Sequence, residues 1–466
     1  MKRQRWPALS ACSVVVLAFV SSHAAAQPPP SADRALAREI LEELVEIQST
    51  EEQGTARAAQ AMAARLIAAG FPKDDVHVIG HDARTQNLVA RFRGPNPGAR
   101  AVLLMAHIDV VPARREDWSV DPWTFLERDG WFYGRGSTDN KAGAAMLVAN
   151  FITLKRAGWQ PSRDFIIVLT GDEETAQKSI QWLLAERRAL VDAEVAFNTD
   201  GGGIRPRDGR PAVFEVQASE KIYADYQLEV TDVGGHSSLV RPDNPIYTLA
   251  AALTRIGDHQ FPLHVNEVTR MFLERSSATE SGQTAIDMRA VAAVPPDLAA
   301  AARLTRTPFF NAQIRTTCVA TRVDAGHANN ALPQMARAVV NCRILPGLPG
   351  ADVEAVIRRL AGEKVTVTVL EPPIVSPPST LTPALLSRLE PLVAKHWPNV
   401  PIIPLMQAGA TDGMYTRNAG IPTYGVSGIE ENPDDVRAHG KDERVGVESF
   451  YRAAQFWLEL MREFGQ

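Results

Sequence analysis

The stretch AVLLMAHID, residues 101–109, sets the pattern that decides the fold. An unbroken apolar run of this length is typical of a strand that is buried on both faces of a sheet. The run ends in two polar residues, His107 and Asp109. Because side chains alternate along a strand with period two, these residues lie on the same side of the chain. One of them could bind a metal ion while the other orients it.

Three further short runs of apolar or aromatic residues repeat this pattern, at 130–134, 165–169 and 195–197. Each run is followed by acids, which are Asp139, Glu173, Glu174 and Asp200. Segments with helical spacing separate the runs, which predicts an α/β fold with a mostly parallel, mixed sheet. Binding sites form at the carboxyl ends of strands in such sheets, so we expect the acids to meet His107 there.

The pattern changes near residue 219 and resumes after residue 372. We therefore expect a catalytic domain in two parts, 32–218 and 373–466, with a smaller α+β domain inserted at 219–372. The stretch 258–310 has weak periodicity and is interpreted as an extension of the insert. The predicted strands of the insert lie at 226–230, 315–323, 336–344 and 365–370.

The N-terminus predicts an export signal. Basic residues near the start precede an apolar run at 9–20, and three alanines at 24–26 supply the small residues of a cleavage site. We expect residues 1–26 to be removed and the mature protein to be periplasmic or secreted. The apolar run is too short for a stable membrane span, although an uncleaved anchor is the alternative.

Charge and cysteine content exclude several classes of protein. The formal net charge is −5, and no long basic run is present, which argues against a nucleic-acid partner. Three cysteines are too few for a disulfide scaffold or a cysteine-ligated metal site. Cys318 and Cys342 flank a predicted hairpin centred near Asn330, which would place them opposite each other. A disulfide and two unrelated buried thiols both remain open.

The residues at the predicted strand ends have the chemistry of a metal site. Glu173 and Glu174 are adjacent carboxylates, which repel each other unless a positive charge compensates. One could bind a metal ion while the other takes a proton from a water molecule. Each acid alone could be a solvated loop residue or a helix cap, but four such coincidences favour a metal centre. With His439 they form a set of two histidines and three carboxylates, suited to two divalent ions, zinc first and cobalt or manganese as alternatives.

Seven segments, in the same order, resemble the M20 metallopeptidase family of carboxypeptidases, dipeptidases, aminoacylases and desuccinylases. They are MAHIDVVPA, GRGSTDNKAG, TGDEE, NTDGGG, GGHSS, GATDG and HGKDERV. Within the family, the chain is most similar to carboxypeptidase S-like members. The resemblance implies a zinc-peptidase-like catalytic domain with an inserted lid, or dimerisation, domain.

The resemblance also implies a ligand set for two metal ions. Asp139 would bridge both ions. His107 and Asp200 would hold one ion, and Glu174 and His439 would hold the other.

Catalytic roles follow from the same resemblance. Glu173 would be the general base, and Asp109 would orient the imidazole of the metal-binding histidine. His236, in GGHSS, would polarise the scissile carbonyl. The family also has a cis peptide bond after its bridging aspartate, which here is Asp139–Asn140.

Three further residues would bind substrate. Asn330 and Arg343 match lid residues, and the arginine suits a terminal carboxylate because it can donate two parallel hydrogen bonds. The loop at 409–412, with Asp412, would face the substrate. The chain departs from the family at Ala142, where a glycine is usual, and at Asn341, where an acid is usual.

These expectations combine into one function. The chain should hydrolyse amide bonds in small peptides that carry a free C-terminal carboxylate, as a carboxypeptidase or dipeptidase. An N-acyl amino acid deacylase is the nearest alternative, and a non-catalytic binding protein on the same fold is another. A homodimer through the lid is possible, but the long insert leaves monomer and dimer both open.

Overall fold

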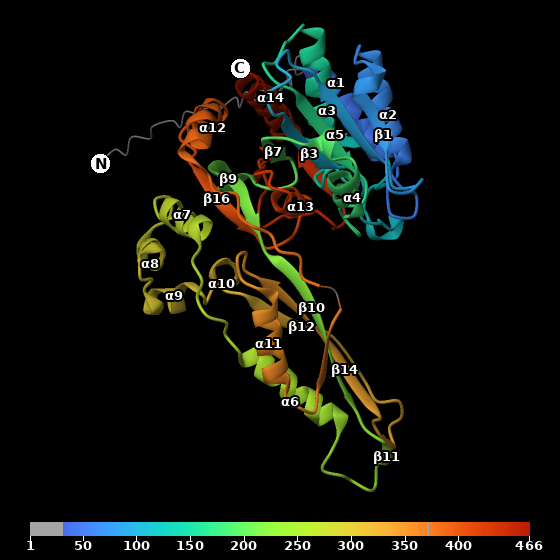
Figure 1. Cartoon of the computed structure of the whole chain (residues 1–466), viewed down its shortest axis with the longest axis vertical. Helices are drawn as coiled ribbons and strands as arrows, with labels where there is room; N and C mark the ends of the chain where they lie inside the picture. Colours follow the sequence, from blue (N-terminus) through green and yellow to red (C-terminus); the bar gives the residue numbers. More distant parts are fainter. Residues whose placement is uncertain (1–30, 371) are drawn as a thin grey trace, which may run out of the picture.

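The structure is a computed structural model that describes residues 31–370 and 372–466 (Figure 1). The predicted export signal at 1–26 lies outside these residues. None of the helices in the described ranges combines the length and the apolar character that a membrane span requires.

A nine-stranded mixed sheet forms the centre of the catalytic part, in the order β1-β2-β6-β3-β7-β17-β9-β16 with β8 paired to β9. The strands β6, β3, β7 and β17 run parallel to one another. This confirms the predicted α/β class. The strands are β1 Val76–Ile79, β2 Asn87–Phe92, β3 Val102–His107, β6 Phe165–Thr170, β7 Val195–Asn198, β8 Gly203–Arg207, β9 Arg210–Glu220, β16 Ile402–Gln407 and β17 Thr423–Gly425.

Helices cover both faces of this sheet, which explains why its central strands are apolar without alternation. Along β3, Leu104 packs in the core of one helical layer and Leu103 in the core of the other. The first layer holds α1 Ala32–Glu46, α2 Ala56–Ala68, α3 Lys141–Arg156, α12 Pro383–His396 and α14 Val447–Phe464. The second holds α4 Lys178–Glu186, α5 Arg188–Val191 and α13 Gly413–Asn418.

The aromatic run at 130–134 does not join the large sheet. Its strand β5, Trp131–Tyr133, pairs with β4, Leu126–Arg128, and β18, Arg444–Gly446, in a separate antiparallel sheet. Phe132 packs instead against Phe450 of α14, at a ring distance of 5.8 Å. The expectation that Asp139 follows a strand of the parallel sheet is therefore wrong. Asp139 lies in the loop between β5 and α3.

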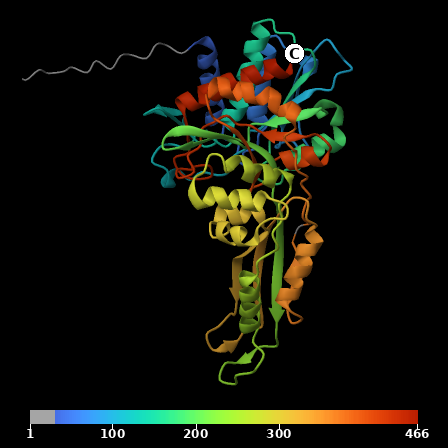
Figure 2. The same ribbon diagram turned by 90° about the vertical axis from the view of Figure 1, so that its left-hand side faces the viewer.

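The inserted unit contains a four-stranded antiparallel sheet, in the order β12-β14-β10-β15. Figures 1 and 2 show it projecting from the large sheet, with β11 at its far end. Helices α6 and α11 pack against it in a separate core. Its elements are β10 Ile222–Thr231, β11 Gly235–His236, α6 Pro245–Asp258, β12 Thr317–Ala325, β13 Ala331–Leu332, β14 Met335–Ile344, α11 Gly350–Ala361 and β15 Thr366–Val369.

One residue, Lys221, separates strand β9 of the large sheet from strand β10 of the insert. Its side chain is fully buried, and its Nζ donates to the backbone oxygen of Arg315 at 2.9 Å. Arg315 lies just before β12, where the chain returns into the insert. The lysine therefore ties together two of the segments that cross between the two parts. Burial lowers the pKa of Lys221 to about 7.

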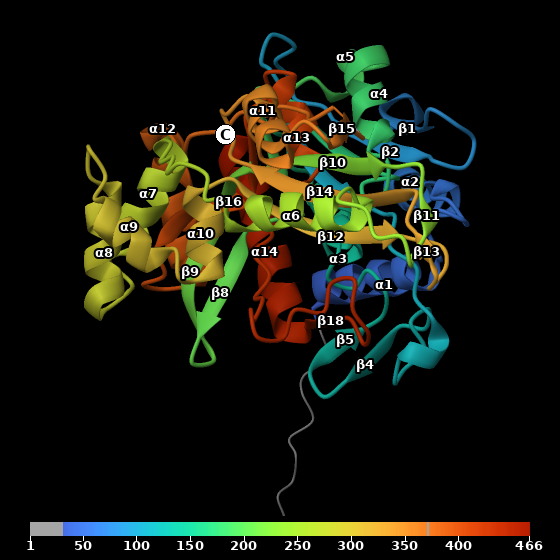
Figure 3. The same ribbon diagram turned by 90° about the horizontal axis from the view of Figure 1, so that it is seen from below.

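The stretch interpreted as an extension of the insert forms four short helices that pack on the large sheet. Phe272 and Leu273 share a core with Val213 of β9 and Ile403 of β16. Figure 3 shows these helices beside β16. The interpretation as an extension of the insert is therefore corrected. In the folded protein these helices pack on the catalytic part, because their apolar faces cover an outer strand of the catalytic sheet. The helices are α7 Glu267–Ser276, α8 Gly282–Ala292, α9 Leu298–Leu304 and α10 Pro308–Ile314.

The predicted hairpin is present, and its register places Cys318 opposite Cys342. The two Cα atoms are 4.1 Å apart, and the sulfur atoms form a disulfide. Of the two alternatives that the sequence left open, the structure has the disulfide.

Removing this disulfide should destabilise the inserted unit. We expect the variant with both Cys318→Ser and Cys342→Ser to lose about 3 kcal/mol of unfolding free energy, because the bond closes a loop of about 25 residues in the unfolded chain. Urea unfolding of the variant and the parent protein measures the loss. Thiol titration of the denatured parent before and after reduction is the control, and a result without two additional thiols would contradict the bond.

Candidate metal centre

The end of β3 places His107 at the heart of the predicted site. The side chain is 1% exposed, and its Nδ1 lies 3.0 Å from the backbone oxygen of Asp109. Nδ1 is therefore the donor, which leaves Nε2 as the metal-binding nitrogen. Nε2 lies 2.9 Å from Oδ1 of Asp139.

The carboxylate of Asp109 supports the neighbouring acids as well as the histidine. It lies 3.5 Å from the imidazole of His107. It also accepts hydrogen bonds from the backbone nitrogens of Glu173, at 3.1 Å, and Glu174, at 2.9 Å. The residue thus positions the loop after β6 in addition to its predicted contact with the histidine.

Asp139 lies between the two predicted histidine ligands. Its Oδ1 contacts His107, and its Oδ2 lies 3.2 Å from Nε2 of His439. That nitrogen also lies 2.8 Å from Oε2 of Glu174. The Asp139–Asn140 bond is cis, as the resemblance implied. This arrangement suits the predicted bridging role of Asp139, which stays a prediction.

The potential ligand atoms form two overlapping groups. Those of His107, Asp139 and Glu174 all lie within 4.8 Å of one another. The same holds for those of His107, Glu173 and Asp200. The structure therefore brings the predicted ligands and the predicted base into one cluster, which reaches the surface at His439, whose side chain is 55% exposed.

The protein itself supplies too little positive charge to balance the buried carboxylates of this cluster. Burial raises the pKa of Asp200 to about 8. Burial, together with the charge of Asp200, also raises the pKa of Glu173 well above its usual value. Hydrogen bonds with Asp139 and Glu174 raise the pKa of His439 to about 10. A positive charge placed among these acids would lower the pKa of Asp200 and of Glu173 again.

Divalent cations would meet this demand for positive charge. Within residues 31–370 and 372–466, no Lys or Arg forms an ion pair with Asp139, Glu174 or Asp200. The available donors are imidazole nitrogens and carboxylate oxygens, a set that suits zinc and also cobalt or manganese. The residues present therefore fit a two-metal centre.

Two predicted lid residues do not lie at this centre. His236 is in β11, at the far end of the insert, where its Nδ1 lies 2.7 Å from the hydroxyl of Ser238. The backbone oxygen of Asn330 accepts a hydrogen bond from the backbone nitrogen of Ser237 at 3.1 Å, so Asn330 lies at the same end. The long strands of the insert carry both residues away from the metal cluster. Neither residue lies beside the metal cluster of its own chain in this conformation, and their roles in substrate binding and catalysis stay predictions.

Arg343 lies at the border between the insert and the catalytic part, and Asp412 lies within the catalytic part. Nη1 of Arg343 donates to the backbone oxygen of Ala408 at 3.4 Å, so the arginine borders the loop at 409–412. Asp412 accepts a hydrogen bond from Thr170 at 2.5 Å and is only 4% exposed. Burial raises its pKa to about 7. Asp412 is therefore buried against the end of β6, and its predicted contact with substrate stays a prediction.

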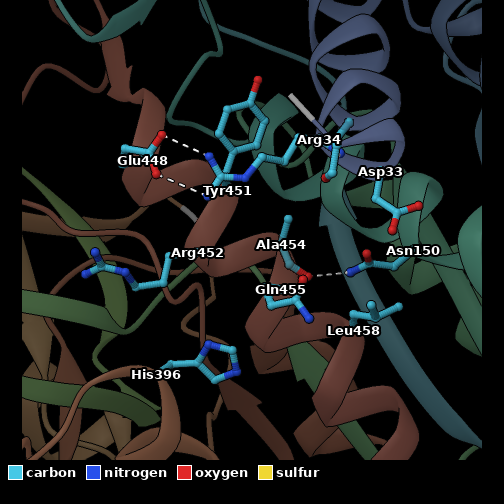
Figure 4. Close-up of a pocket in the computed structure, with 12 residues that line it drawn as sticks. Asp33, Arg34, Asn150, His396, Glu448, Tyr451, Arg452, Ala454, Gln455 and Leu458 are labelled. Carbon is cyan, nitrogen blue, oxygen red and sulfur yellow. Dashed lines mark hydrogen bonds and ion pairs between the residues drawn. The ribbon is translucent and has the colours of Figure 1, made fainter. Parts of the chain in front are cut away.

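A separate polar pocket lies between α1, α12 and α14 (Figure 4). It is lined by residues that include Arg34, Asn150, His396 and Tyr451. Arg34 forms two hydrogen bonds with Glu448 across it, at 3.0 and 3.1 Å. No predicted site residue lines this pocket, so it is distinct from the metal centre.

Sequence reasoning missed Glu443, which holds the loop that carries Asp139. Its carboxylate accepts hydrogen bonds from three backbone nitrogens, those of residues 136, 138 and 139, at 2.9 to 3.0 Å. It also pairs with Arg135 at 2.7 Å. Arg135 donates in turn to the backbone oxygen of Gly440 at 3.1 Å. This fully buried pair therefore connects the loop of Asp139 with the loop of His439, and only the short spacing from His439 to Glu443 could have signalled it.

Breaking this pair should affect both stability and metal binding. Glu443→Ala should lower the unfolding free energy of the metal-free protein by about 3–5 kcal/mol, because it leaves a buried guanidinium unpaired. It should also weaken zinc binding by about 10- to 100-fold, because the ligand loops lose their support. Denaturant unfolding and competition with a chelator measure the two effects.

The matched control is Glu448→Ala, which removes an exposed carboxylate from its pair with Arg34. Its effect on unfolding should stay below about 1 kcal/mol. Equal effects of the two substitutions would contradict the role assigned to Glu443.

Comparisons with known proteins agree with this geometry. The family described as Peptidase family M20/M25/M40 matches residues 103–463. Human N-fatty-acyl-amino acid synthase/hydrolase PM20D1 is 31% identical over 382 residues, which cover 80% of this chain and 75% of that protein. Human aminoacylase-1 is 27% identical, over 80% of this chain and 82% of its own.

Solved structures share the fold. The M20 family metallo-carboxypeptidase Sso-CP2 from Sulfolobus solfataricus superimposes with a TM-score of 0.68 at 17% identity, covering 92% of this chain and 99% of that one. With the family match across most of its length and a cluster that fits two metal ions, the chain belongs to the M20/M25/M40 peptidase family and is a hydrolase of amide bonds.

Proposed function

We propose that this protein is an exported two-zinc hydrolase whose substrates carry a free carboxylate on the amine side of the scissile amide bond. The observation that carries the proposal is the buried cluster in which Glu173 lies among potential metal ligands. An acid in this position has the surroundings of a general base.

Five residues would hold the ions: His107, Asp139, Glu174, Asp200 and His439. When bound, the ions would supply the positive charge that acidifies a water molecule and polarises the scissile carbonyl. Glu173 would accept the proton of that water and later return it to the leaving amine. Asp109 would keep the base in place through its hydrogen bond with the Glu173 backbone.

Arg343 would bind the carboxylate of the substrate. It lies at the end of the insert that borders the catalytic part, and its guanidinium stacks over the ring of Tyr223 at 4.7 Å. A planar guanidinium can form two parallel hydrogen bonds with a carboxylate. His236 and Asn330 would take part only after the insert moves, or in the site of a second copy in a homodimer.

Two classes of substrate carry a free carboxylate at this position, N-acyl amino acids and short peptides. The names of the relatives PM20D1 and aminoacylase-1 favour N-acyl amino acids over short peptides. We therefore place N-acyl amino acids first and short peptides second.

Export is supported by the N-terminal signal pattern in the sequence. The disulfide between Cys318 and Cys342 is a second support, because such bonds persist in oxidising compartments.

Glu173→Ala should abolish turnover while both zinc ions stay bound, because the substitution removes the base and no proposed ligand. Steady-state assays of the zinc-loaded protein and elemental analysis of its zinc content measure the two properties. Glu186→Ala, which removes an exposed glutamate at the end of α4, is the matched control and should keep wild-type activity. Retained turnover in Glu173→Ala would contradict the proposed mechanism.

A substrate panel tests the proposed specificity. N-acyl amino acids, dipeptides and longer peptides, each with a free or methyl-esterified carboxylate, are assayed with the zinc-loaded protein. We expect cleavage of free acids over esters, with N-acyl amino acids as the best substrates. Arg343→Ala should raise KM for the free acids by about 10- to 100-fold, the value of a charged hydrogen bond, and remove the preference over esters.

Arg337→Ala is the control for this experiment, since Arg337 lies on the same strand and pairs with Asp324 at the surface. An unchanged preference for free acids in Arg343→Ala would exclude the proposed carboxylate site. Cleavage of peptides alone would reverse the order of the two substrate classes.

A further inference from the structure

A glutamine and a tyrosine outside the predicted site hold the side chain of Glu173. Nε2 of Gln177 donates a hydrogen bond to Oε1 of Glu173 at 2.9 Å. The hydroxyl of Tyr415 donates in turn to Oε1 of Gln177 at 3.3 Å. The three side chains thus form a hydrogen-bonded series that runs from α13, across the start of α4, to the acid.

The orientation of the Gln177 amide follows from its two neighbours. The amide nitrogen faces Glu173 and donates to its carboxylate oxygen. The amide oxygen then faces Tyr415, whose hydroxyl can donate to it. In the reversed orientation, the amide oxygen of Gln177 would contact a carboxylate oxygen of Glu173.

The backbone of Gln177 fixes where this side chain begins. Its φ of 50° lies in the left-handed region, directly before α4. Its backbone nitrogen donates to the oxygen of Asp172 at 2.8 Å, which closes the turn that carries Glu173. The side chain is half-buried, and it folds back over this turn to reach the acid four residues earlier.

The amide donates to one oxygen of the carboxylate, Oε1, and so restricts the rotation of the Glu173 side chain.

We propose that Gln177 and Tyr415 are positioning residues that hold Glu173 in the geometry needed for proton transfer. This inference rests on the proposed role of Glu173 as the general base. Without the amide, the Glu173 side chain is free to adopt other rotamers, and its reactive oxygen leaves the water that it must deprotonate. Substrate affinity and metal binding do not depend on this contact, so the effect falls on kcat.

The test compares variants of the zinc-loaded full chain on the best substrate of the panel. Gln177→Ala should lower kcat by about 10- to 100-fold, because a displacement of about 1 Å in a reacting group can cost a factor of 100. KM, the zinc content and the thermal unfolding midpoint should stay at the wild-type values. Alanine and glutamine both carry a Cβ atom, so the substitution leaves the cost of the left-handed backbone nearly unchanged.

Tyr415→Phe should lower kcat by about fivefold, the effect of one neutral hydrogen bond. Because the tyrosine acts through Gln177, adding Tyr415→Phe to Gln177→Ala should cause no further loss. Gln181→Ala is the matched control, since Gln181 is an exposed glutamine one turn further along α4 whose side chain donates to the backbone oxygen of Gln177 at 2.9 Å. It should keep the wild-type kcat.

Each outcome separates this inference from the proposed function. Turnover by Glu173→Ala would overturn the proposed mechanism and this inference with it. An inactive Glu173→Ala together with wild-type kcat in Gln177→Ala would overturn the inference alone. A loss of zinc or of thermal stability that accounts for the lower kcat, or additive effects of the two substitutions, would also overturn it.

Discussion

The crowding of buried carboxylates at the ends of β3, β6 and β7 is the constraint on which the rest of the structure depends. Like charges in a buried cluster repel one another, and lysine or arginine partners would neutralise the groups that must bind metal. The chain instead supports these acids with neutral donors. Asp109 accepts hydrogen bonds from two backbone nitrogens, and Glu173 accepts one from an amide. Two buried cations are engaged elsewhere: Arg135 pairs with Glu443, and Lys141 donates to the backbone oxygen of Ile47.

The parallel pairing of β3, β6 and β7 fixes the relative positions of the loops that carry these acids. His107 pairs with Thr170 at the end of β6, and Met105 pairs with Asn198 at the end of β7. The loops that carry the acids therefore begin at nearly the same level. Because both faces of the sheet are packed with apolar side chains, the strand ends cannot shift independently. The rigid core is what brings His107 and Asp200, which are 93 positions apart, into one cluster.

The sequence was sufficient for the features that depend on local pattern. The unbroken apolar run before His107 predicted a strand buried on both faces, and the register about Asn330 placed Cys318 opposite Cys342. Features that depend on tertiary contacts were not accessible. The aromatic run before Asp139 has the length of a strand, but nothing in it indicates that it pairs with β18, more than 300 residues later. Glu443 forms hydrogen bonds with a distant loop, and Gln177 forms one across a turn. Such contacts leave no periodic pattern in the sequence. The positions of His236 and Asn330 depend on the direction of the insert, which residue patterns do not specify.

A single buried residue, Lys221, separates β9 from β10, so strand β10 follows strand β9 almost without interruption. With about 3.4 Å per residue, the ten residues of β10 span about 34 Å. The insert is therefore a long spacer that keeps β11, with His236, far from the metal cluster of its own chain.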